Sequence, residues 1–434
     1  MNTPHPTYLI EILNLLIKAN YAKIIKEEAQ KLGISIDSNI IEALLSPSPS
    51  IALIASLSGG KDSACMILLV NKFLTAIHYT GEKIICHADL GEIEHIESMQ
   101  EVERVARFVG WKLKIVRREK GGLLERYTQR WQDNCRRWAN LQSVNLISPF
   151  PSANGRYCTS ELKIAPITQA AVKLFPKALI LNLIGLRAEE SAKRAKNPIS
   201  KPNKKLSRAD GTRGRDWFPI LDTKIETVWL THHNEKFPRH PQYDRGNQRV
   251  SCAYCFLASK NDWEKGAAVP TNHNSYRHIV ELELRSSFSY RHQDWLADIQ
   301  PDILSTEFRN QITSSKENAI ARRLIESRIP KEVLFANSGG KQGWPSFQPS
   351  MDQCEIIAAV RRDIAKLIGP EIERASNSEI LYTTAQTVHD RYAQLLAQRQ
   401  VQLTAQNRRA NRSTKIPSLL LPAIPAALAQ AALF

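Results

Sequence analysis

Apolar and polar residues alternate along the middle of the chain in a pattern that predicts strands and helices in turn. Residues 51–55 form a short apolar run, a glycine-containing turn follows, and residues 64–74 show helical periodicity. Further strands are predicted at 83–87, 112–116 and 179–184, and further helices at 93–109 and 160–174. This alternation predicts right-handed βαβ units and therefore an α/β fold with a doubly wound parallel sheet. A ligand of such a sheet binds at the carboxyl ends of its strands.

Two flanking regions differ from this central part. Residues 1–50 show helical spacing and end in the linker-like sequence SPSPS, so they predict a small N-terminal helical segment. Residues 266–434 predict a mainly helical C-terminal region, with helices at 315–327, 352–368 and 376–399. We therefore expect three parts, 1–50, 51–265 and 266–434. Prolines interrupt the apolar residues 416–434, which favours a tail or docking segment over a membrane span.

The charge of the chain points to an anionic partner. Its 434 residues include 59 Lys and Arg against 43 Asp and Glu, a net charge of +16. Ten basic and three acidic residues lie between 187 and 215, where prolines and glycines predict a mobile basic loop without regular elements. A second basic stretch, 399–415, contains no acidic residue. Such clusters either bind nucleic acid or remain solvated surface, and both interpretations stay open.

The most specific signal is the sequence SGGKDS at residues 58–63, between the first predicted strand and the helix after it. Two glycines let backbone amides close around an anion, and the helix N-terminus behind them adds further donors. Lys61 supplies a positive charge, while Asp62 fits a metal ion or a helix cap. The glycine spacing and the aspartate after Lys61 exclude a Walker loop. A second SGGK, at 338–341, follows no predicted strand and is expected to be an ordinary loop.

In this position SGGKDS resembles the PP-loop of ATP pyrophosphatases, which split ATP between its α and β phosphates. Further segments resemble the phosphoadenosine phosphosulfate (PAPS) reductase family of that superfamily. They are DLGE at 89–92, RYCTSELK at 156–163, GLRAEES at 185–191 with Arg194, and PILD at 219–222 with Val228 and Trp229. The resemblance covers about residues 50–265 and implies a Rossmann-like fold of the adenine nucleotide alpha-hydrolase type.

The resemblance also implies a site for ATP, or for a PAPS-like adenine nucleotide, together with Mg²⁺. Lys61, Asp62 and Arg187 are the predicted catalytic residues. The predicted nucleotide-binding residues are Ser58, Gly59, Gly60, Lys61, Asp62, Ser63, Asp89, Lys163, Arg187 and Arg194.

Simple chemistry agrees with these assignments. Lys163, Arg187 and Arg194 follow predicted strands or lie between predicted elements, where their charges could converge on phosphates. Asp89 and Glu92 stand at the carboxyl end of a predicted strand, where they could hold a ribose or magnesium. Equally, they could be ordinary carboxylates at the start of a helix.

The cysteines provide a second candidate site. Seven cysteines are too few for a disulfide scaffold, and the N-terminus lacks the pattern of a signal peptide, so we expect a cytoplasmic protein with free thiols. Cys252 and Cys255 form a Cys-x-x-Cys pair, which suits a metal centre, a redox pair or two buried cysteines. Cys158 lies in a family-like segment, and Cys135 precedes it by 23 residues. The other three, Cys65, Cys86 and Cys354, are expected to be small core residues.

The resemblance sharpens the metal hypothesis. Some sulfonucleotide reductases, and the DNA phosphorothioation protein DndC, hold a 4Fe–4S cluster through paired cysteines in this part of the chain. This implies a cluster bound by Cys135, Cys158, Cys252 and Cys255. Cluster-bearing reductases have two adjacent cysteines where this chain has Tyr157 before Cys158, so zinc or no metal stay open.

Reductases of the family carry their catalytic cysteine in a Glu-Cys-Gly tail, and this sequence contains none. The resemblance therefore favours the DndC-like branch: an enzyme that splits ATP into AMP and pyrophosphate and activates an acceptor for sulfur transfer or nucleic-acid modification. A sulfonucleotide reductase and a non-enzymatic nucleotide-binding regulator are the alternatives. The expected partners are an adenine nucleotide, nucleic acid through residues 187–215 and 399–415, and a sulfur-donor protein, with no membrane.

Overall fold

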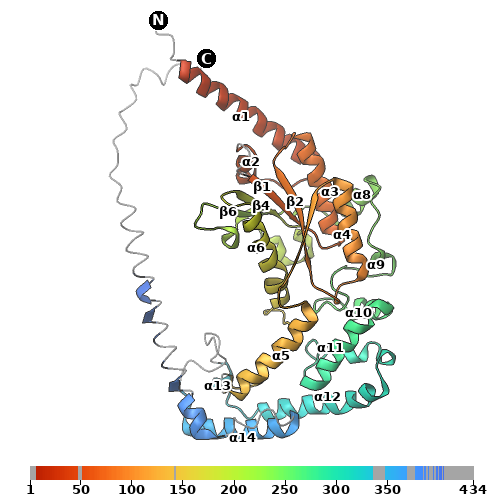
Figure 1. Cartoon of the computed structure of the whole chain (residues 1–434), viewed down its shortest axis with the longest axis vertical. Coiled ribbons are helices and arrows are strands. Elements are labelled where there is room, and N and C mark those ends of the chain that lie inside the picture. Colours follow the sequence, from red (N-terminus) through yellow and green to blue (C-terminus); the bar gives the residue numbers. More distant parts are fainter. Residues whose placement is uncertain are drawn as a thin grey trace. The chain divides into compact units, whose positions relative to one another are not determined.

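The computed structural model describes residues 6–46, 51–140, 143–335, 348–368 and 377–384, with isolated short stretches as far as 404. Six strands form one sheet in the order β3-β2-β1-β4-β6-β5 (Figure 1). Neighbouring strands are parallel except for β5 and β6, so the predicted α/β fold with a mostly parallel sheet is confirmed. The strands are β1 (Ile51–Ser56), β2 (Glu82–Asp89), β3 (Lys112–Arg117), β4 (Leu179–Leu183), β5 (Ser200–Pro202) and β6 (Arg213–Trp217).

Helices cover both faces of the sheet. One face packs against α3 (Lys61–Ala76), α4 (Ile96–Val109) and α8 (Ile225–Asn234), together with α1 (Pro6–Lys31) and α2 (Ser38–Leu44). The other face packs against α6 (Ala165–Leu174), which continues a π-helical turn, Cys158–Ile164. Because β1 lies in the middle and is buried on both faces, its residues are almost all apolar.

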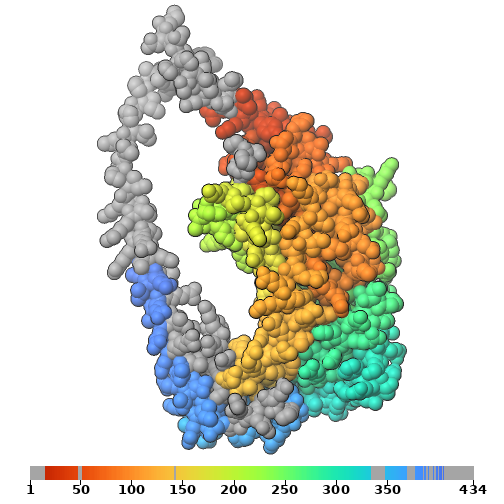
Figure 2. Space-filling view, in the orientation of Figure 1, coloured from red at the N-terminus to blue at the C-terminus, as the bar shows by residue number. Residues whose placement is uncertain are grey.

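The predicted loop at 187–215 is wrong, because the structure contains regular elements there. These residues include α7 (Ala192–Ala195), β5, and the first three residues of β6, which pairs with β4 from Leu179↔Arg213 to Leu183↔Trp217. Pairing with a distant strand supplies the hydrogen bonds, and a locally charged sequence gives no sign of it. The hairpin of β5 and β6, yellow-green in Figure 2, exposes Lys204, Lys205 and Arg208.

The N-terminal helices are attached to the sheet domain through Ser35. Its backbone N–H donates to the carbonyl oxygen of Pro219 at 2.7 Å, and its carbonyl accepts from the indole N–H of Trp217 at 2.8 Å. Its hydroxyl donates to the Asp222 carboxylate, also at 2.8 Å. The family-like segment at 219–222 therefore positions the N-terminal helices.

The chain divides into two compact units, Met1–Asn134 with Ile147–Ala321, and Cys135–Leu146 with Arg322–Phe434. The first contains the sheet and the helices that follow it. In the second, the buried Arg361 donates to the carbonyl oxygen of Ser143 at 3.0 Å and lies over the ring of Trp138. The remaining α-helices are α5 (Leu123–Ala139), α9 (Pro241–Asp244), α10 (Lys260–Ala267), α11 (His273–Ser286), α12 (Thr306–Glu326), α13 (Lys331–Phe335) and α14 (Met351–Ile368).

The C-terminal region is mainly helical where the structure describes it, with turns and short 3-10 segments between α11 and α12. The helices predicted at 315–327 and 352–368 correspond to α12 and α14, and residues 378–384 are helical as well. Across the described part of the chain, no helix combines the length and apolarity needed to cross a membrane. The second SGGK at 338–341, the basic residues of 399–415 and the segment 416–434 lie outside the described residues.

Candidate active site

The candidate site lies at the carboxyl end of β1, where the order of strands reverses. After β1 the chain forms β2 and β3 on one side, and it returns as β4 on the other side. A reversal of this kind opens a crevice between the loops that follow the two central strands. A cavity of about 500 Å³ is found here, lined by Ser58, Lys61 and Asp62 after β1 and by Gly185 after β4.

Two glycines allow the chain to pass closely at this point. Gly59 has a φ of 76°, and a Cβ there would lie 3.0 Å from the carbonyl oxygen of Ser98. A Cβ on Gly185 would lie 2.9 Å from the Cα of Ser63. Side chains at these positions would therefore displace backbone, which explains both glycines better than flexibility does.

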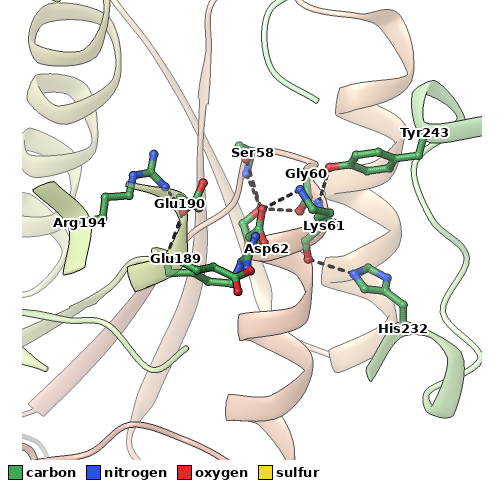
Figure 3. Close-up of polar contacts among 11 residues, drawn as sticks. Ser58, Gly60, Lys61, Asp62, Glu189, Glu190, Arg194, His232 and Tyr243 are labelled. Atoms are coloured by element: carbon green, nitrogen blue, oxygen red, sulfur yellow. Dashed lines mark hydrogen bonds and ion pairs between the residues drawn. The ribbon is translucent and has the colours of Figure 1, made fainter. Parts of the chain in front are cut away.

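The two serines of the loop hold its shape. The hydroxyl of Ser63 donates to the carbonyl oxygen of Gly60 at 2.9 Å and accepts from the backbone N–H of Ser58 at 3.3 Å (Figure 3). The two hydroxyls lie 3.2 Å apart. Gly60 is the N-cap of α3 and has no side chain to cap it. The amide of Lys61 donates to Tyr243, so the amides that follow Lys61 in the first turn are the ones open to an anion.

Asp62 contacts both of the other residues predicted to be catalytic, Lys61 and Arg187. One carboxylate oxygen lies 3.2 Å from Nζ of Lys61, and the other accepts from Nε of Arg187 at 2.6 Å. Arg187 also pairs with Glu189. Lys61 and Arg187 are buried, at 8% and 4% exposure. Asp62 compensates the charge of Lys61, and Asp62 and Glu189 together compensate that of Arg187.

Two aromatic residues that we did not predict, Tyr243 and His232, form hydrogen bonds with the backbone of Lys61. The backbone N–H of Lys61 donates to the hydroxyl of Tyr243 at 3.0 Å, and its Nζ lies 5.4 Å from the centre of that ring. The carbonyl oxygen of Lys61 accepts from Nε2 of His232 at 3.0 Å, so that nitrogen carries the proton (Figure 3). Burial lowers the pKa of His232, which keeps the ring neutral.

Arginines gather around the same cavity. Arg156, Arg194 and Arg249 line it, and Arg194 also pairs with Glu190. Burial lowers the pKa of Arg194, and the charges of Arg249, Arg156 and Arg187 lower it further. Positive charges that disfavour one another are relieved by an anion, so the site suits a multiply charged ligand. Arg249 was missed, although it stands three residues before the Cys-x-x-Cys pair.

Asp89 and Glu92, the carboxylates predicted to hold a ribose or magnesium, do not line the cavity, whereas Glu94 does. Asp89 accepts from Nε of Arg117 at 3.0 Å and from the backbone of the following turn, and it is not among the residues that line the cavity. Glu92 is exposed. The carboxylate that does line the cavity is Glu94, which lies 3.6 Å from Nε2 of the buried His87.

Three of the four predicted metal-binding cysteines line this cavity, namely Cys158, Cys252 and Cys255. Burial raises the pKa of the Cys158 and Cys252 thiols, and the charge of Lys163 opposes that rise. The fourth, Cys135, belongs to α5 and is not among the lining residues. Within the described residues, no group of three or more His, Cys, Asp or Glu is placed to hold a metal ion. The three core cysteines are buried as predicted.

Lys163, a predicted nucleotide-binding residue, lines the cavity beside the thiols. Burial by itself lowers the pKa of this ammonium, but the neighbouring Cys252, Glu94, Cys255 and Cys158 outweigh burial and raise it. Lys163 is therefore charged, and it faces both the sulfur atoms and the phosphate loop across one cavity.

Comparison with known proteins agrees with this geometry. The profile of the phosphoadenosine phosphosulfate reductase domain matches residues 52–258. The chain carries a PAPS reductase domain. The matched range contains all of the sheet except Ile51, together with the phosphate loop and the three thiols, so the candidate site lies within the PAPS reductase domain.

Relatives of the whole chain are distant. An uncharacterized protein of Methanocaldococcus jannaschii is 24% identical over 248 residues, which are 57% of this chain; the chain spans 43% of that protein's length. An uncharacterized 37.8 kDa protein of Escherichia phage 186 is 25% identical over 243 residues, covering 48% of this chain and 68% of the phage protein.

Two solved structures are similar at a low level. A PAPS reductase from Candida auris, in a phosphate complex, gives a TM-score of 0.33 at 12% identity, covering 53% of this chain and 95% of its own. The FMN adenylyltransferase of Candida glabrata, in complex with FAD and inorganic pyrophosphate, gives 0.32 at 14% identity, covering 55% and 74%.

Proposed function

We propose that this protein binds ATP at residues 58–63 and splits it into AMP and pyrophosphate, activating an acceptor for sulfur transfer or nucleic-acid modification in the manner of the DndC-like branch. The PAPS reductase domain supports a nucleotide-utilising PP-loop enzyme. The observation that carries the proposal is the pairing of Lys61 and Arg187 on Asp62 at the uncapped N-terminus of α3. Two cations and a row of amides at one point suit a polyphosphate.

In the proposed reaction a nucleophilic atom of the acceptor attacks the α-phosphorus of ATP. A bond to phosphorus forms, the bond to the oxygen between the α and β phosphates breaks, and its electron pair leaves with pyrophosphate. The proton of the acceptor passes to water, and AMP stays bonded to the acceptor. When the sulfur of the donor forms its bond to the acceptor, the bond to AMP breaks and AMP leaves with its electron pair. Lys61 and the first amides of α3 hold the phosphates, while Arg187 and Arg194 stabilise the charge that builds on the leaving group.

Magnesium fits this site only through the nucleotide. Both carboxylate oxygens of Asp62 are engaged, one by Lys61 and one by Arg187, so Asp62 does not fit as a magnesium ligand in this arrangement. We propose that Mg²⁺ arrives on the phosphates of ATP, because magnesium sites commonly take most of their ligands from substrate phosphates and water. Asp62 then serves to orient the two cations.

We further propose that Cys158, Cys252 and Cys255 bind a metal centre, a 4Fe–4S cluster in preference to zinc, with Cys135 retained as the candidate fourth ligand. Thiolates are the ligands that both kinds of centre prefer, so the residue types fit. The described structure does not gather the three thiols as metal ligands, so binding requires them to move closer together. When bound, a cluster would supply electron transfer or a place for sulfur beside the activated acceptor. The residues of this chain hold the thiols in the cavity next to the charged Lys163.

The test is pyrophosphate release and ATP affinity in Lys61→Ala. Losing a charge-assisted contact should weaken ATP binding by about 1.5–3 kcal/mol and suppress pyrophosphate release. Lys72→Ala is the matched control, because Lys72 stands on the same helix, is half exposed and pairs with Glu235 away from the cavity. Unchanged ATP affinity in a folded Lys61→Ala variant would contradict the assignment of the phosphate loop.

The products separate the proposal from its rivals. A sulfonucleotide reductase would release sulfite from PAPS and no pyrophosphate from ATP, and a regulator would bind nucleotide without either product. Cys354 is fully buried and burial raises its pKa, so this cysteine is unsuited to act as a nucleophile.

A further inference from the structure

One face of α1 carries large apolar side chains that nothing in the described part of the chain covers. Leu16, Ile17 and Ile24 are 57%, 56% and 44% exposed. Ile17 and Ile24 stand seven residues apart, about two turns of one helix, and Asn20 lies between them on the same face and is exposed as well. Single exposed apolar residues need no explanation, but a row of them along one helix indicates an interaction surface.

A different face of α1 attaches the helix to the domain. Ile25 and Ala29 are fully buried, and they belong to the core that covers one face of the sheet. At this end α1 contacts both α2 and α3. The helix cannot turn Ile17 and Ile24 toward the domain without withdrawing Ile25 and Ala29 from that core. The exposed face therefore remains open to a partner.

The exposed face has the spacing of a coiled-coil seam, in which two positions of every seven residues face a partner helix. Ile17 and Ile24 share the first of these positions, and the sequence of α1 repeats it at Ile10. Leu13 and Asn20 share the second position, three residues after an isoleucine. A β-branched residue at the first position and leucine at the second favour a pair of helices over a larger bundle. The seam of α1 therefore suits one partner helix.

We propose that α1 pairs with α1 of a second copy of this chain, as a parallel two-stranded coiled coil along Ile10, Leu13, Ile17, Asn20 and Ile24. A second copy presents the same residues at the same spacing, so the seam is complementary to itself. Two-fold symmetric dimers are also the commonest homo-oligomers. The inference concerns assembly and does not depend on the proposed reaction.

Asn20 selects a parallel pair. In a parallel coiled coil in register each seam residue faces its own counterpart, so the two Asn20 side chains meet and can hydrogen-bond to each other. In an antiparallel pair a residue at the second seam position faces one at the first, and the first positions of this seam are Ile10, Ile17 and Ile24. Asn20 would then be buried against isoleucine without a hydrogen-bond partner, which costs free energy.

The charges beside the seam favour the same arrangement. Lys23 stands one residue before Ile24, and Glu28 stands four residues after it. In a parallel coiled coil, residues at these two flanking positions on opposite helices lie next to each other, so Lys23 of one copy meets the partner's Glu28. Within one helix, Nζ of Lys23 lies 3.9 Å from a carboxylate oxygen of Glu27, and Nζ of Lys31 lies 3.6 Å from one of Glu28. Such surface pairs are weak, so they can be exchanged for a pair across the dimer.

The test is the oligomeric state of the full chain without nucleotide, measured by sedimentation equilibrium over a range of concentrations. The wild type should form dimers, and Ile17→Lys should raise their dissociation constant by about 100-fold or more, because each dimer loses two buried isoleucines. Lysine forms helices well and Ile17 is exposed, so circular dichroism should show an unchanged fold. Leu230→Lys is the matched control and should leave the dimer intact, since Leu230 is 55% exposed on another helix, α8.

Cross-linking tests the orientation of the two helices. Asn20→Cys should form a disulfide between copies under mild oxidation, because counterparts at a seam position of a parallel pair lie close enough for one. Lys26→Cys is the control, since Lys26 is exposed on the same helix but lies off the seam. The wild type shows how much cross-linking the native cysteines contribute.

Three results would overturn the inference. A wild type that stays monomeric at concentrations on the order of 0.1 mM would show that α1 does not pair with itself. Dimers that persist in Ile17→Lys would place the interface elsewhere on the chain. Dimers that are lost in Ile17→Lys, but that Asn20→Cys does not cross-link, would contradict the parallel pair.

Discussion

The phosphate loop, residues 58–63, and the thiol loop, residues 252–255, line one cavity but are stabilised in opposite ways. In the phosphate loop the side chains have partners within the protein, as Asp62 holds both Lys61 and Arg187. A phosphate that binds there must compete with an existing carboxylate. Binding is therefore an exchange of one anion for another, which favours ligands of high charge over weakly charged ones.

In the thiol loop it is the backbone that has partners. The indole N–H of Trp263 donates to the backbone carbonyl oxygen of Cys255 at 2.9 Å. The hydroxyl of Tyr290 donates to the backbone carbonyl oxygen of Tyr254 at 2.5 Å. In the described structure the thiols of Cys252 and Cys255 take part in no hydrogen bond. In one loop, therefore, the charged side chains are paired within the protein, whereas in the other the backbone is held by hydrogen bonds and the thiols are not.

The sharpest way to separate the two loops is to remove a thiol. Cys252→Ala should abolish iron and labile sulfide in anaerobically purified protein, because a cluster that loses a thiolate is not retained. Cys354→Ala, a buried cysteine in α14, should keep the full content. Nucleotide binding should persist in both variants. Stoichiometric zinc without iron would make the site structural, and metal content unchanged in Cys252→Ala would remove it from the ligand set.

The converse experiment disturbs only the phosphate loop. Gly59→Ala should weaken ATP binding by on the order of 100-fold, because strain at positive φ adds to a displaced Ser98 backbone. Gly110→Ala is the matched control, since Gly110 has a φ of 68° but no atom within 4 Å of an added Cβ. It should cost about 1 kcal/mol of stability and leave ATP affinity unchanged. Equal ATP affinity in the two variants would show that the close approach of Ser98 is unimportant.

Acid should weaken the support of the phosphate loop first. His240 has its Nε2 3.3 Å from the hydroxyl of Ser98, and His95 packs against it. Burial lowers the pKa of both histidines to about 4, so they stay neutral in the fold. Their contribution to the free energy of unfolding is complete above about pH 6.5, the pKa of histidine in the unfolded chain. It is lost as the pH falls from 6.5 to 4, and the loss is on the order of 3 kcal/mol for each histidine.

Base should weaken the support of the thiol loop instead. Glu283 is fully buried and accepts from the backbone N–H of Tyr290 at 2.6 Å. Burial raises its pKa to about 8, so its contribution is present below the unfolded value of about 4.5 and is lost as the pH rises to 8. The free energy of unfolding can be measured by denaturant at several values between pH 4 and 8. Its decrease toward low pH should be smaller in His240→Asn, and its decrease toward high pH should be smaller in Glu283→Gln. Unaltered decreases in these variants would assign the pH dependence to other groups.

The smallest effect concerns the exposed hairpin rather than either loop. If nucleic acid is the acceptor, log K should fall with log[salt] by about 0.9 per duplex phosphate neutralised. Neutralising Lys201, Lys204, Lys205 and Arg208 together should flatten that slope by several units and leave ATP binding unchanged. The control neutralises four exposed lysines of α1, namely Lys18, Lys23, Lys26 and Lys31. No detectable binding to DNA or RNA at low salt would favour a small-molecule acceptor.

Local signals made the central features predictable. β1, the SGGKDS loop and α3 are adjacent in the sequence, and each is recognisable from its own residues. The pairing of strands β1 to β4 follows from their alternation with helices. The three thiols could also be selected, because Cys-x-x-Cys is a local pattern and Cys158 lies in a family-like segment.

The contacts that complete the site could not be predicted, because they join distant parts of the chain. Tyr243 and His232 reach Lys61 across 182 and 171 residues, and nothing near them in the sequence indicates a nucleotide. β6 was missed because its sequence RGRDW is charged although the strand lies between β4 and β5, and its partner in β4 lies 34 residues earlier. The sequence also could not show which way the side chain of Asp89 points. Its carboxylate accepts a hydrogen bond from Arg117.

The attachment of Ser35 has a consequence for biosynthesis. Helices α1 and α2 are joined to the sheet domain by a hydrogen bond between residues 187 positions apart, from Ser35 to Asp222. At ordinary rates of translation the partner segment follows after roughly 10–40 s. During that time the side chains of α1 and α2 that later enter the core, among them Ile25 and Ile40, remain without β6 and its flanking turn. The nascent chain therefore presents an uncovered apolar surface until that segment is made.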